Sequence, residues 1–229
     1  MADGLIRAEW EKYRPRVLAL SELEYNFDAK AYHESKDKSG WNIDHYVGEL
    51  LREPPGAPLK NGAFEAIKED MRFYQFPDPR LISAVFDPDR ELRGRNMLMR
   101  AKFAGFKFYF GVRITDVIDE LRTNPSGHPV QAWGYAYRTL KGHFEIGEIR
   151  FTVTKNLTTG VVEFEIDAYS KSERIPNLFY RMGFRIFGRS LQKYFARSSF
   201  ERLRAVGRRA LAKLETSNAV VVPPPLGIR

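Results

Sequence analysis

One short segment, residues 143–154, concentrates ionisable side chains on an expected β-strand: His143, Glu145, Glu148 and Arg150. An imidazole beside a carboxylate can act as a general acid and base, and an arginine can hold an anionic group of a bound molecule. His143 and Glu148 are therefore the candidate catalytic residues. Strand alternation puts the first two side chains and the last two on opposite faces, so a structural network of hydrogen bonds and ion pairs is the alternative interpretation.

The apolar residues of the same segment change parity at Gly147. Phe144 and Ile146 have one parity, whereas Ile149 and Phe151 have the other. One inserted residue at a β-bulge would produce this switch. The sequence therefore predicts a bend of the sheet at Gly147, which could bring the separated ionisable side chains together.

Three aromatic residues, Trp133, Tyr135 and Tyr137, share one face of the preceding expected strand. Aromatic walls with polar tips can orient an apolar guest. These three residues, with Arg138 and Arg150, are the candidate ligand-binding residues. Two alternatives are an ordinary hydrophobic core and an exposed platform on which nucleic-acid bases stack.

The elements that position these residues follow from residue periodicity. Apolar side chains alternate with others over residues 106–114, which predicts a half-buried strand. Residues 97–103 precede it across Ala104-Gly105, a spacing short enough for a hairpin. Alternation also predicts strands over residues 131–139 and 162–168. Together these segments predict an antiparallel sheet.

The last third of the chain is expected to form a long basic helix. Between Arg174 and Lys213 there are eleven Lys or Arg and one acid, Glu201, a net charge of +10 against +8 for the whole chain. Like charges at i, i+4 spacing repel by about 0.2–0.5 kcal/mol per pair, so a counter-charge is expected. It could come from acids of the strand 162–168, or from phosphate, a lipid head group or RNA. The candidate anion-binding residues at this unbroken spacing are Arg181, Arg185, Arg189, Lys193 and Arg197.

The composition restricts the class of protein. At 229 residues, with 43% apolar residues, the chain can bury a sizeable core. The absence of cysteine excludes disulfides, thiol chemistry and cysteine-built zinc sites, and favours a reducing, cytoplasmic location. The sequence contains no uninterrupted apolar run of about 18 residues, so no transmembrane segment is expected. No metal or cofactor is expected, because no nucleotide-binding glycine loop is present and no metal-ligand spacing links His33, His45, His128 and His143.

Shifts in composition suggest how the chain is divided. A short amphipathic helix is expected over residues 5–14, ended by Pro15. Three prolines between Glu53 and Pro58 predict a rigid connector, and a helix is expected over residues 63–74. The predicted parts are an N-terminal arm with this connector (1–58), a main domain (59–215) and an extended or disordered tail (216–229).

Several blocks resemble a known family. Residues 134–148 carry the pattern Gly-Tyr-x-x-x-Thr-Leu-x-Gly-His-x-x-x-Gly-Glu, which resembles the signature of the nineteen-ninety domain-of-unknown-function family of bacteria and plants. Later blocks at residues 168–170 and 189–197 resemble the same family in order and spacing, and the resemblance spans residues 60–210. It implies an α+β fold similar to the START and birch-pollen-allergen helix-grip superfamily, in which a curved antiparallel sheet wraps a long C-terminal helix around a cavity. It implies no particular activity.

The expected function is binding of a small apolar or lipid-like molecule between the sheet and the C-terminal helix. One alternative is an enzyme that acts on such a molecule through His143 and Glu148. The other is an interaction protein whose basic helix contacts nucleic acid or an anionic lipid surface, which the sequence pI of 9.6 would favour.

Overall fold

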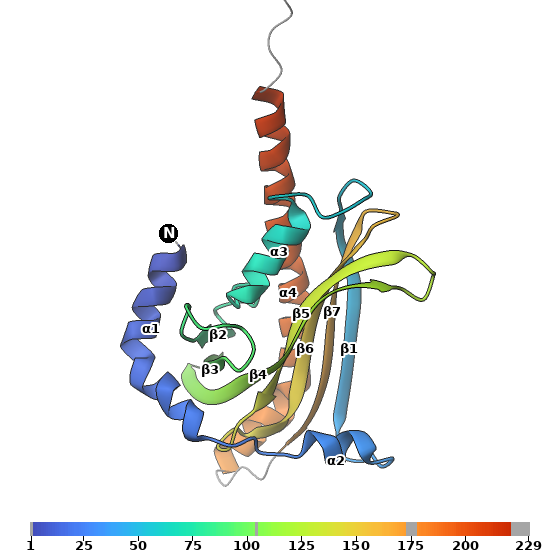
Figure 1. The fold of residues 1–229 in the computed structure, drawn as a ribbon. Coiled ribbons are helices and arrows are strands. Elements are labelled where there is room, and N and C mark those ends of the chain that lie inside the picture. The colour runs from blue at the N-terminus through green and yellow to red at the C-terminus, as the bar shows by residue number, and fades with distance from the viewer. Residues whose placement is uncertain (1, 104, 173–177, 221–229) are drawn as a thin grey trace, which may run out of the picture.

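A computed structural model describes residues 2–103, 105–172 and 178–220. A seven-stranded antiparallel sheet, in the order β1-β7-β6-β5-β4-β3-β2, curves around the long helix α4 (Figure 1). This is an α+β helix-grip arrangement, and it confirms the expected fold class. The strands are β1 (Asn42–Arg52), β2 (Ile82–Val85), β3 (Asn96–Phe103), β4 (Phe106–Thr123), β5 (Pro129–Thr139), β6 (Glu145–Asn156) and β7 (Val161–Ser172), and the helices are α1 (Ala2–Leu18), α2 (Ala29–Glu34), α3 (Ala63–Arg72) and α4 (Leu178–Val220).

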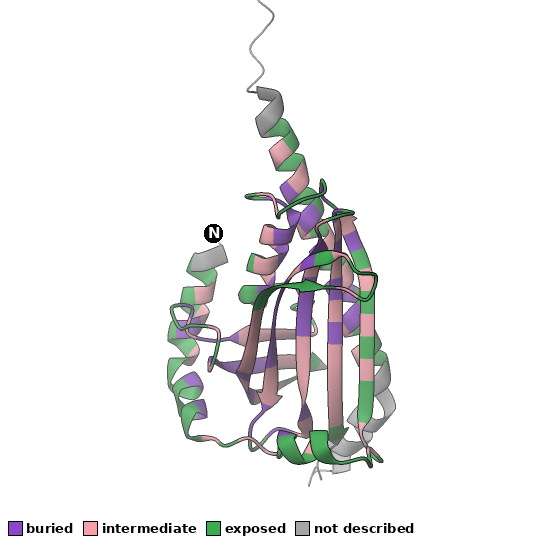
Figure 2. Cartoon of the chain, turned by 45° about the vertical axis from the view of Figure 1, so that its right-hand side comes forward, coloured by how far each residue is buried: buried purple, intermediate pink, exposed green. Residues whose placement is uncertain are grey.

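The predicted hairpin between β3 and β4 is confirmed. Phe103 pairs with Phe106, and Gly105 makes the turn with φ +81°, a conformation that suits glycine. Buried residues concentrate along the strands of the sheet, whereas helix α2 and much of α1 are exposed (Figure 2).

The predicted β-bulge at Gly147 is wrong. β6 keeps a continuous register with β5 and with β7, and the sheet's register shifts lie in β1 and β4 instead. Glycine is needed at position 147 for a different reason, since a Cβ there would lie 2.2 Å from the carbonyl oxygen of Tyr169. Phe144 precedes β6. Within the strand, Ile146 therefore departs from the alternation of the inward-facing Ile149 and Phe151, because its side chain lies on the outer face.

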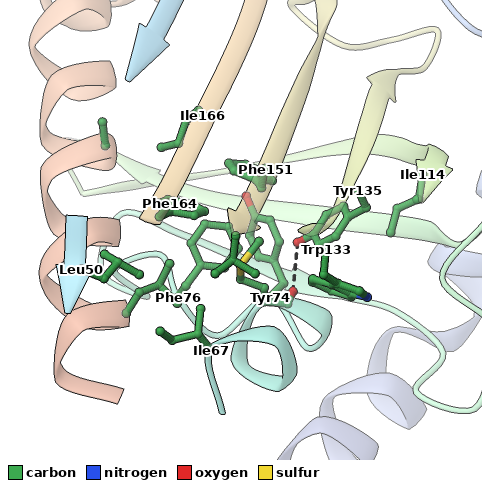
Figure 3. Close-up of a cluster of buried hydrophobic side chains, with 14 of the residues drawn as sticks. Leu50, Ile67, Tyr74, Phe76, Ile114, Trp133, Tyr135, Phe151, Phe164 and Ile166 are labelled. Atoms are coloured by element: carbon green, nitrogen blue, oxygen red, sulfur yellow. Dashed lines mark hydrogen bonds between the residues drawn. The ribbon is translucent and has the colours of Figure 1, made fainter. Parts of the chain in front are cut away.

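Helix α3 fills one half of the concave face. Phe64, Ile67 and Met71 are buried at 1% exposure or less, as the 3- and 4-residue spacing predicts. They meet aromatic rings from the sheet and from the segment after α3. Figure 3 shows this cluster, which includes Tyr74, Phe76, Tyr135, Phe151 and Phe164.

The N-terminal arm packs on the domain rather than standing apart. α1 continues through Pro15 to Leu18, so the predicted end of the helix at Pro15 is wrong. Burial explains the difference: Trp10, Val17 and Leu20 form a second apolar cluster with residues of β2 and β3. The lost backbone hydrogen bond is outweighed by this tertiary contact.

Two predicted boundaries shift. β1 lies inside the predicted arm yet pairs along its length with β7, and the proline-rich connector joins β1 to α3. The strand pattern of β1 was obscured because its outer face carries the exposed apolar residues Ile43 and Val47. At the other end α4 continues to Val220, into the predicted tail, and residues 221–229 lie outside the described ranges. Among the described helices, none is both long and apolar enough to cross a membrane.

Candidate functional site

The other half of the concave face is hollow. A cavity of about 240 Å³ lies where β5 turns into β6, between the sheet and the described part of α4. Its wall is mainly apolar, and the apolar residues include Ile82, Phe108, Phe110, Ile149, Ile166 and Phe195. The wall also includes polar residues, namely Asp44, Tyr46, Lys102, Tyr137, Thr139, His143, Glu145, Glu148, Tyr169, Ser170 and Gln192.

His143 is a buried, neutral donor at this end of the cavity. The ring is 7% exposed, and its edge meets Phe110 with 4.4 Å between ring centroids. Burial lowers the pKa of His143 to about 3, so the imidazole is uncharged at neutral pH. Nδ1 accepts the backbone N–H of Glu145 at 2.9 Å, which assigns the ring proton to Nε2. Within the described residues Nε2 has no hydrogen-bond partner.

Glu145 is the carboxyl group that accompanies His143. It lines the cavity, and its side chain forms no hydrogen bond or ion pair within the described part of the chain. Burial raises the pKa of Glu145, and the nearby Asp44 raises it further. Within the described part of the chain, the imidazole N–H of His143 and the carboxyl group of Glu145 are thus two polar groups of the cavity wall without hydrogen-bond partners.

Two further polar groups of the wall, those of Tyr137 and Thr139, are engaged within the protein. The hydroxyl of Tyr137 lies 3.3 Å from that of Tyr74, and burial raises the pKa of Tyr137 to about 12, so the phenol is neutral. The hydroxyl of Thr139 accepts the N–H of Gly147 at 3.0 Å and donates to Oδ1 of Asn26 at 2.6 Å. These contacts hold the cavity end in shape.

Residues 23–27 of the N-terminal arm form a strap that hydrogen-bonds to the ends of β5 and β6. Asn26 donates from its side chain to the carbonyl of Glu145 at 2.9 Å, and from its backbone to that of Thr139 at 3.3 Å. Tyr25 forms an isolated bridge with Leu140, at the end of β5. The strap fixes the segment that carries His143 and Glu145.

The structure separates the two candidate catalytic residues. Glu148 alternates with Glu145 along the continuous β6 strand, so the two side chains leave the sheet on opposite faces. Glu148 pairs with Arg138, and Arg150 pairs with Asp116 at 3.0 Å. The sequence-based choice of Glu148 depended on a bulge that is not there. Both residues border the cavity, but it is the side chain of Glu145, not that of Glu148, that leaves β6 on the inner face.

The candidate ligand-binding residues also divide. Tyr137 lines the cavity, whereas Trp133 and Tyr135 belong to the filled core, and Tyr135 donates to the carbonyl of Met71 at 3.0 Å. The sequence pattern placed all three on one face correctly. The periodicity of β5 does not show which of these side chains α3 covers and which borders the cavity. Arg138 and Arg150 are in the outer-face ion pairs.

The candidate anion-binding residues are partly described. Lys193 is exposed, and the exposed Arg197 pairs with Glu201 at 2.9 Å. Later on α4, Arg202 and Arg204 donate to backbone carbonyls of other elements. The described part of the helix thus finds several acceptors inside the protein, and an anionic partner stays a prediction. The side chains of the other three candidates lie outside the described part: Arg181, Arg185 and Arg189.

Two contributors to the site were not found from the sequence. Asn26 is 119 residues from Glu145, and Tyr74 is 63 residues from Tyr137. Tyr74 has φ +52°, in the left-handed region, which directs the chain away from the end of α3. Neither residue has a neighbour in the sequence that marks its role.

Comparisons with known proteins found solved structures of low similarity and one matching family. Solved structures that align with the chain include Ara h 8.0201 (12% identity, 75% of this chain and 99% of that chain, TM-score 0.41). A Thalictrum flavum norcoclaurine synthase point mutant in complex with a transition-state analogue also aligns (8% identity, 76% and 96%, TM-score 0.46). So does protein CV1439 from Chromobacterium violaceum (16% identity, 73% and 96%, TM-score 0.37). At these values the alignments carry no argument about ligand or reaction.

No curated protein matches the sequence. The model of the family described as a domain of unknown function (DUF1990) matches residues 28–202, from just before α2 into α4. The match begins earlier than the resemblance indicated, because it includes β1, and it leaves α1 and the strap residues 23–27 outside. Since the match covers most of the chain, the protein belongs to the DUF1990 family.

Proposed function

We propose that this protein binds a small, largely apolar molecule in the cavity and holds a polar end of that molecule with His143 and Glu145. The observation that carries the proposal is that, within the described residues, the buried imidazole of His143 and the partly exposed carboxyl group of Glu145 border a cavity with a mainly apolar wall and have no hydrogen-bond partner there. Buried polar groups in folded proteins nearly always have hydrogen-bond partners, because leaving one unpaired costs about 1–3 kcal/mol. A bound molecule would supply the missing partners.

The chemistry of the two groups defines the polar end. The neutral imidazole donates from Nε2, so it suits an oxygen acceptor. The Glu145 carboxyl group can accept a hydrogen bond from a hydroxyl. A single hydroxyl group can accept from His143 and donate to Glu145 at once, so an apolar molecule with one hydroxyl fits the described wall.

Binding explains these residues better than acid–base catalysis by the pair first considered. His143 has a pKa of about 3, far below the operating range of a general base at neutral pH. Glu148 is committed to Arg138. Glu145 is the one group of the set whose raised pKa would suit proton transfer, and it needs no role beyond holding the ligand.

Native mass spectrometry of the protein purified from its own host tests the proposal. We expect a stoichiometric mass excess, released on denaturation as an apolar compound that carries a hydroxyl group. Ala168→Phe places a ring in the cavity wall and should lower the bound fraction at least about tenfold. Val47→Phe adds the same ring on the exposed outer face of β1 and should leave binding unchanged. An empty wild-type protein that also fails to take up apolar fluorescent probes would contradict the proposal.

A further inference from the structure

A second group of ionisable residues lies on the outer face of the sheet, away from the cavity. His45 of β1 stands directly opposite Asp167 of β7, and Glu165 lies two residues before Asp167 on the same face. Val47, opposite Glu165, is 57% exposed, so solvent reaches this face. All three ionisable side chains come from the interior of paired strands, which hold their backbone positions rigidly.

The three side chains converge. His45 Nδ1 lies 2.7 Å from an oxygen of Asp167 and 3.7 Å from an oxygen of Glu165. Each residue offers one possible ligand atom, and these three atoms all lie within 4.8 Å of one another. The side chains are 54%, 47% and 29% exposed for His45, Asp167 and Glu165, so an ion can reach them while part of the group stays screened from water.

These distances resemble those of a three-ligand zinc site before the ion enters. Zinc binds imidazole nitrogen and carboxylate oxygen at about 2.0–2.2 Å in a tetrahedron, which places neighbouring ligand atoms about 3.4 Å apart. The ligand atoms of this group lie within 4.8 Å of one another, so changes in side-chain rotation would be enough to reach that spacing. Zinc would replace the proton between Nδ1 and Asp167, and the fourth position would face solvent.

The charges around the group favour a cation. Two carboxylates share the space with one imidazole, and the nearest basic side chain on β6, Arg150, stands across from Asp167 but pairs with Asp116. Arg122 acts on Glu165 through space without a hydrogen bond to it. A divalent ion would offset the repulsion between the two carboxylates directly.

We propose that His45, Glu165 and Asp167 form a zinc-binding site on the outer face of the sheet. One imidazole with two carboxylates suits a borderline divalent ion such as zinc better than magnesium or calcium, which prefer oxygen ligands alone. The site is independent of the cavity, because its side chains leave β1 and β7 on the opposite face from Tyr46 and Ile166, which line the cavity. Sequence spacing did not indicate it, since the ligands lie on strands far apart in the chain.

Calorimetric titration of the tag-free, full-length protein with zinc chloride tests the site, and cobalt(II) absorption reports its coordination. We expect one equivalent to bind, with affinity reduced at least about tenfold in His45→Gln and in Asp167→Asn. Two control variants should bind as the wild type does: His33→Gln, a histidine outside the group, and Glu163→Gln, an acid on the same face of β7. Far-UV circular dichroism checks that each variant is folded.

Three results would overturn the proposal. The first is the absence of zinc binding by the folded wild-type protein. The second is an unchanged zinc affinity in folded His45→Gln. The third is tighter binding of magnesium or calcium than of zinc, which would assign the group to a carboxylate-only cation site. Retained binding in both control variants, with loss in the two ligand variants, supports it.

Discussion

The two halves of the concave sheet face start from the same sequence pattern and end in different states. Next to α3, the rings of Tyr135 and Phe151 are buried at 1% exposure or less and fill the space. At the other end of the same strands, Tyr137 and Ile149 face a cavity of about 240 Å³. Alternation makes a face apolar, whereas a second layer of structure decides whether that face is filled. Here α3 and the segment after it supply that layer for one half only.

Each half also contains a buried carboxyl group, and their surroundings differ. In the filled half, one oxygen of Asp70 is buried without a partner in the described residues, but Arg202 and Arg209 lie close enough to favour its charge. In the hollow half, the nearby charged group that acts on Glu145 is Asp44, another acid. Basic side chains therefore act on the first group, whereas an acid acts on the second.

The largest expected difference between the halves is in packing. Phe151→Ala should lower the free energy of unfolding by about 3–5 kcal/mol, because it removes a ring that packs against the rings of Phe76 and Tyr135 in a closed core. Ile149→Ala should cost less than about 2 kcal/mol, since that side chain already borders empty space. Urea unfolding measures both values. Equal losses would show that the cavity half is as tightly packed as the other.

A smaller effect is expected from His143 in the hollow half. Its pKa of about 3 in the folded protein lies below the ordinary value of 6.5, so only the unfolded chain takes up a proton between these values. The stabilising contribution is complete above pH 6.5 and is lost as the pH falls toward 3. We expect wild-type protein to lose about 2 kcal/mol from this group between pH 7 and pH 5.

His143→Asn should remove that pH dependence, because the amide oxygen can still accept the Glu145 N–H but does not titrate. Urea unfolding at several pH values measures the slope. His33→Asn, which replaces an exposed histidine, is the matched control and should keep the wild-type slope. Identical slopes for wild type and His143→Asn would mean that the imidazole is hydrated and not buried.

The smallest expected effect comes from Asp70 in the filled half. Its contribution to stability changes with pH in the opposite direction to that of His143. Burial raises the pKa of Asp70 to about 6 from 3.8, so the folded protein gains stability from this group as the pH falls through 6. Asp70→Asn should therefore be more stable than wild type at pH 7, by about 1 kcal/mol after allowing for partial exposure, and equal to it near pH 4. Thermal unfolding at both pH values measures this, with Glu69→Gln as an exposed control. A less stable Asp70→Asn at pH 7 would show that the arginines outweigh burial.

The local pattern of the sequence was enough to determine the class of fold. Alternation predicted the β3–β4 hairpin and the inner faces of β5, of β7 and of β6 after Gly147, and the 3- and 4-residue spacing predicted α3. These signals survive because each depends on residues close together in the chain. The family followed from a block that includes His143 and Gly147, which tertiary structure then places at the end of the cavity.

Tertiary structure alone decided which residues meet. A continuous register on β6, instead of a bulge, selects Glu145 over Glu148 for the cavity. The strap brings Asn26 to a strand 119 residues away, and strand pairing brings His45 to Asp167 across 122 residues. Such contacts depend on the register between distant strands and on which layer covers each half of the sheet, and no local periodicity encodes either. The sequence therefore determined the faces of the elements, and packing determined where the protein is filled, hollow or charged.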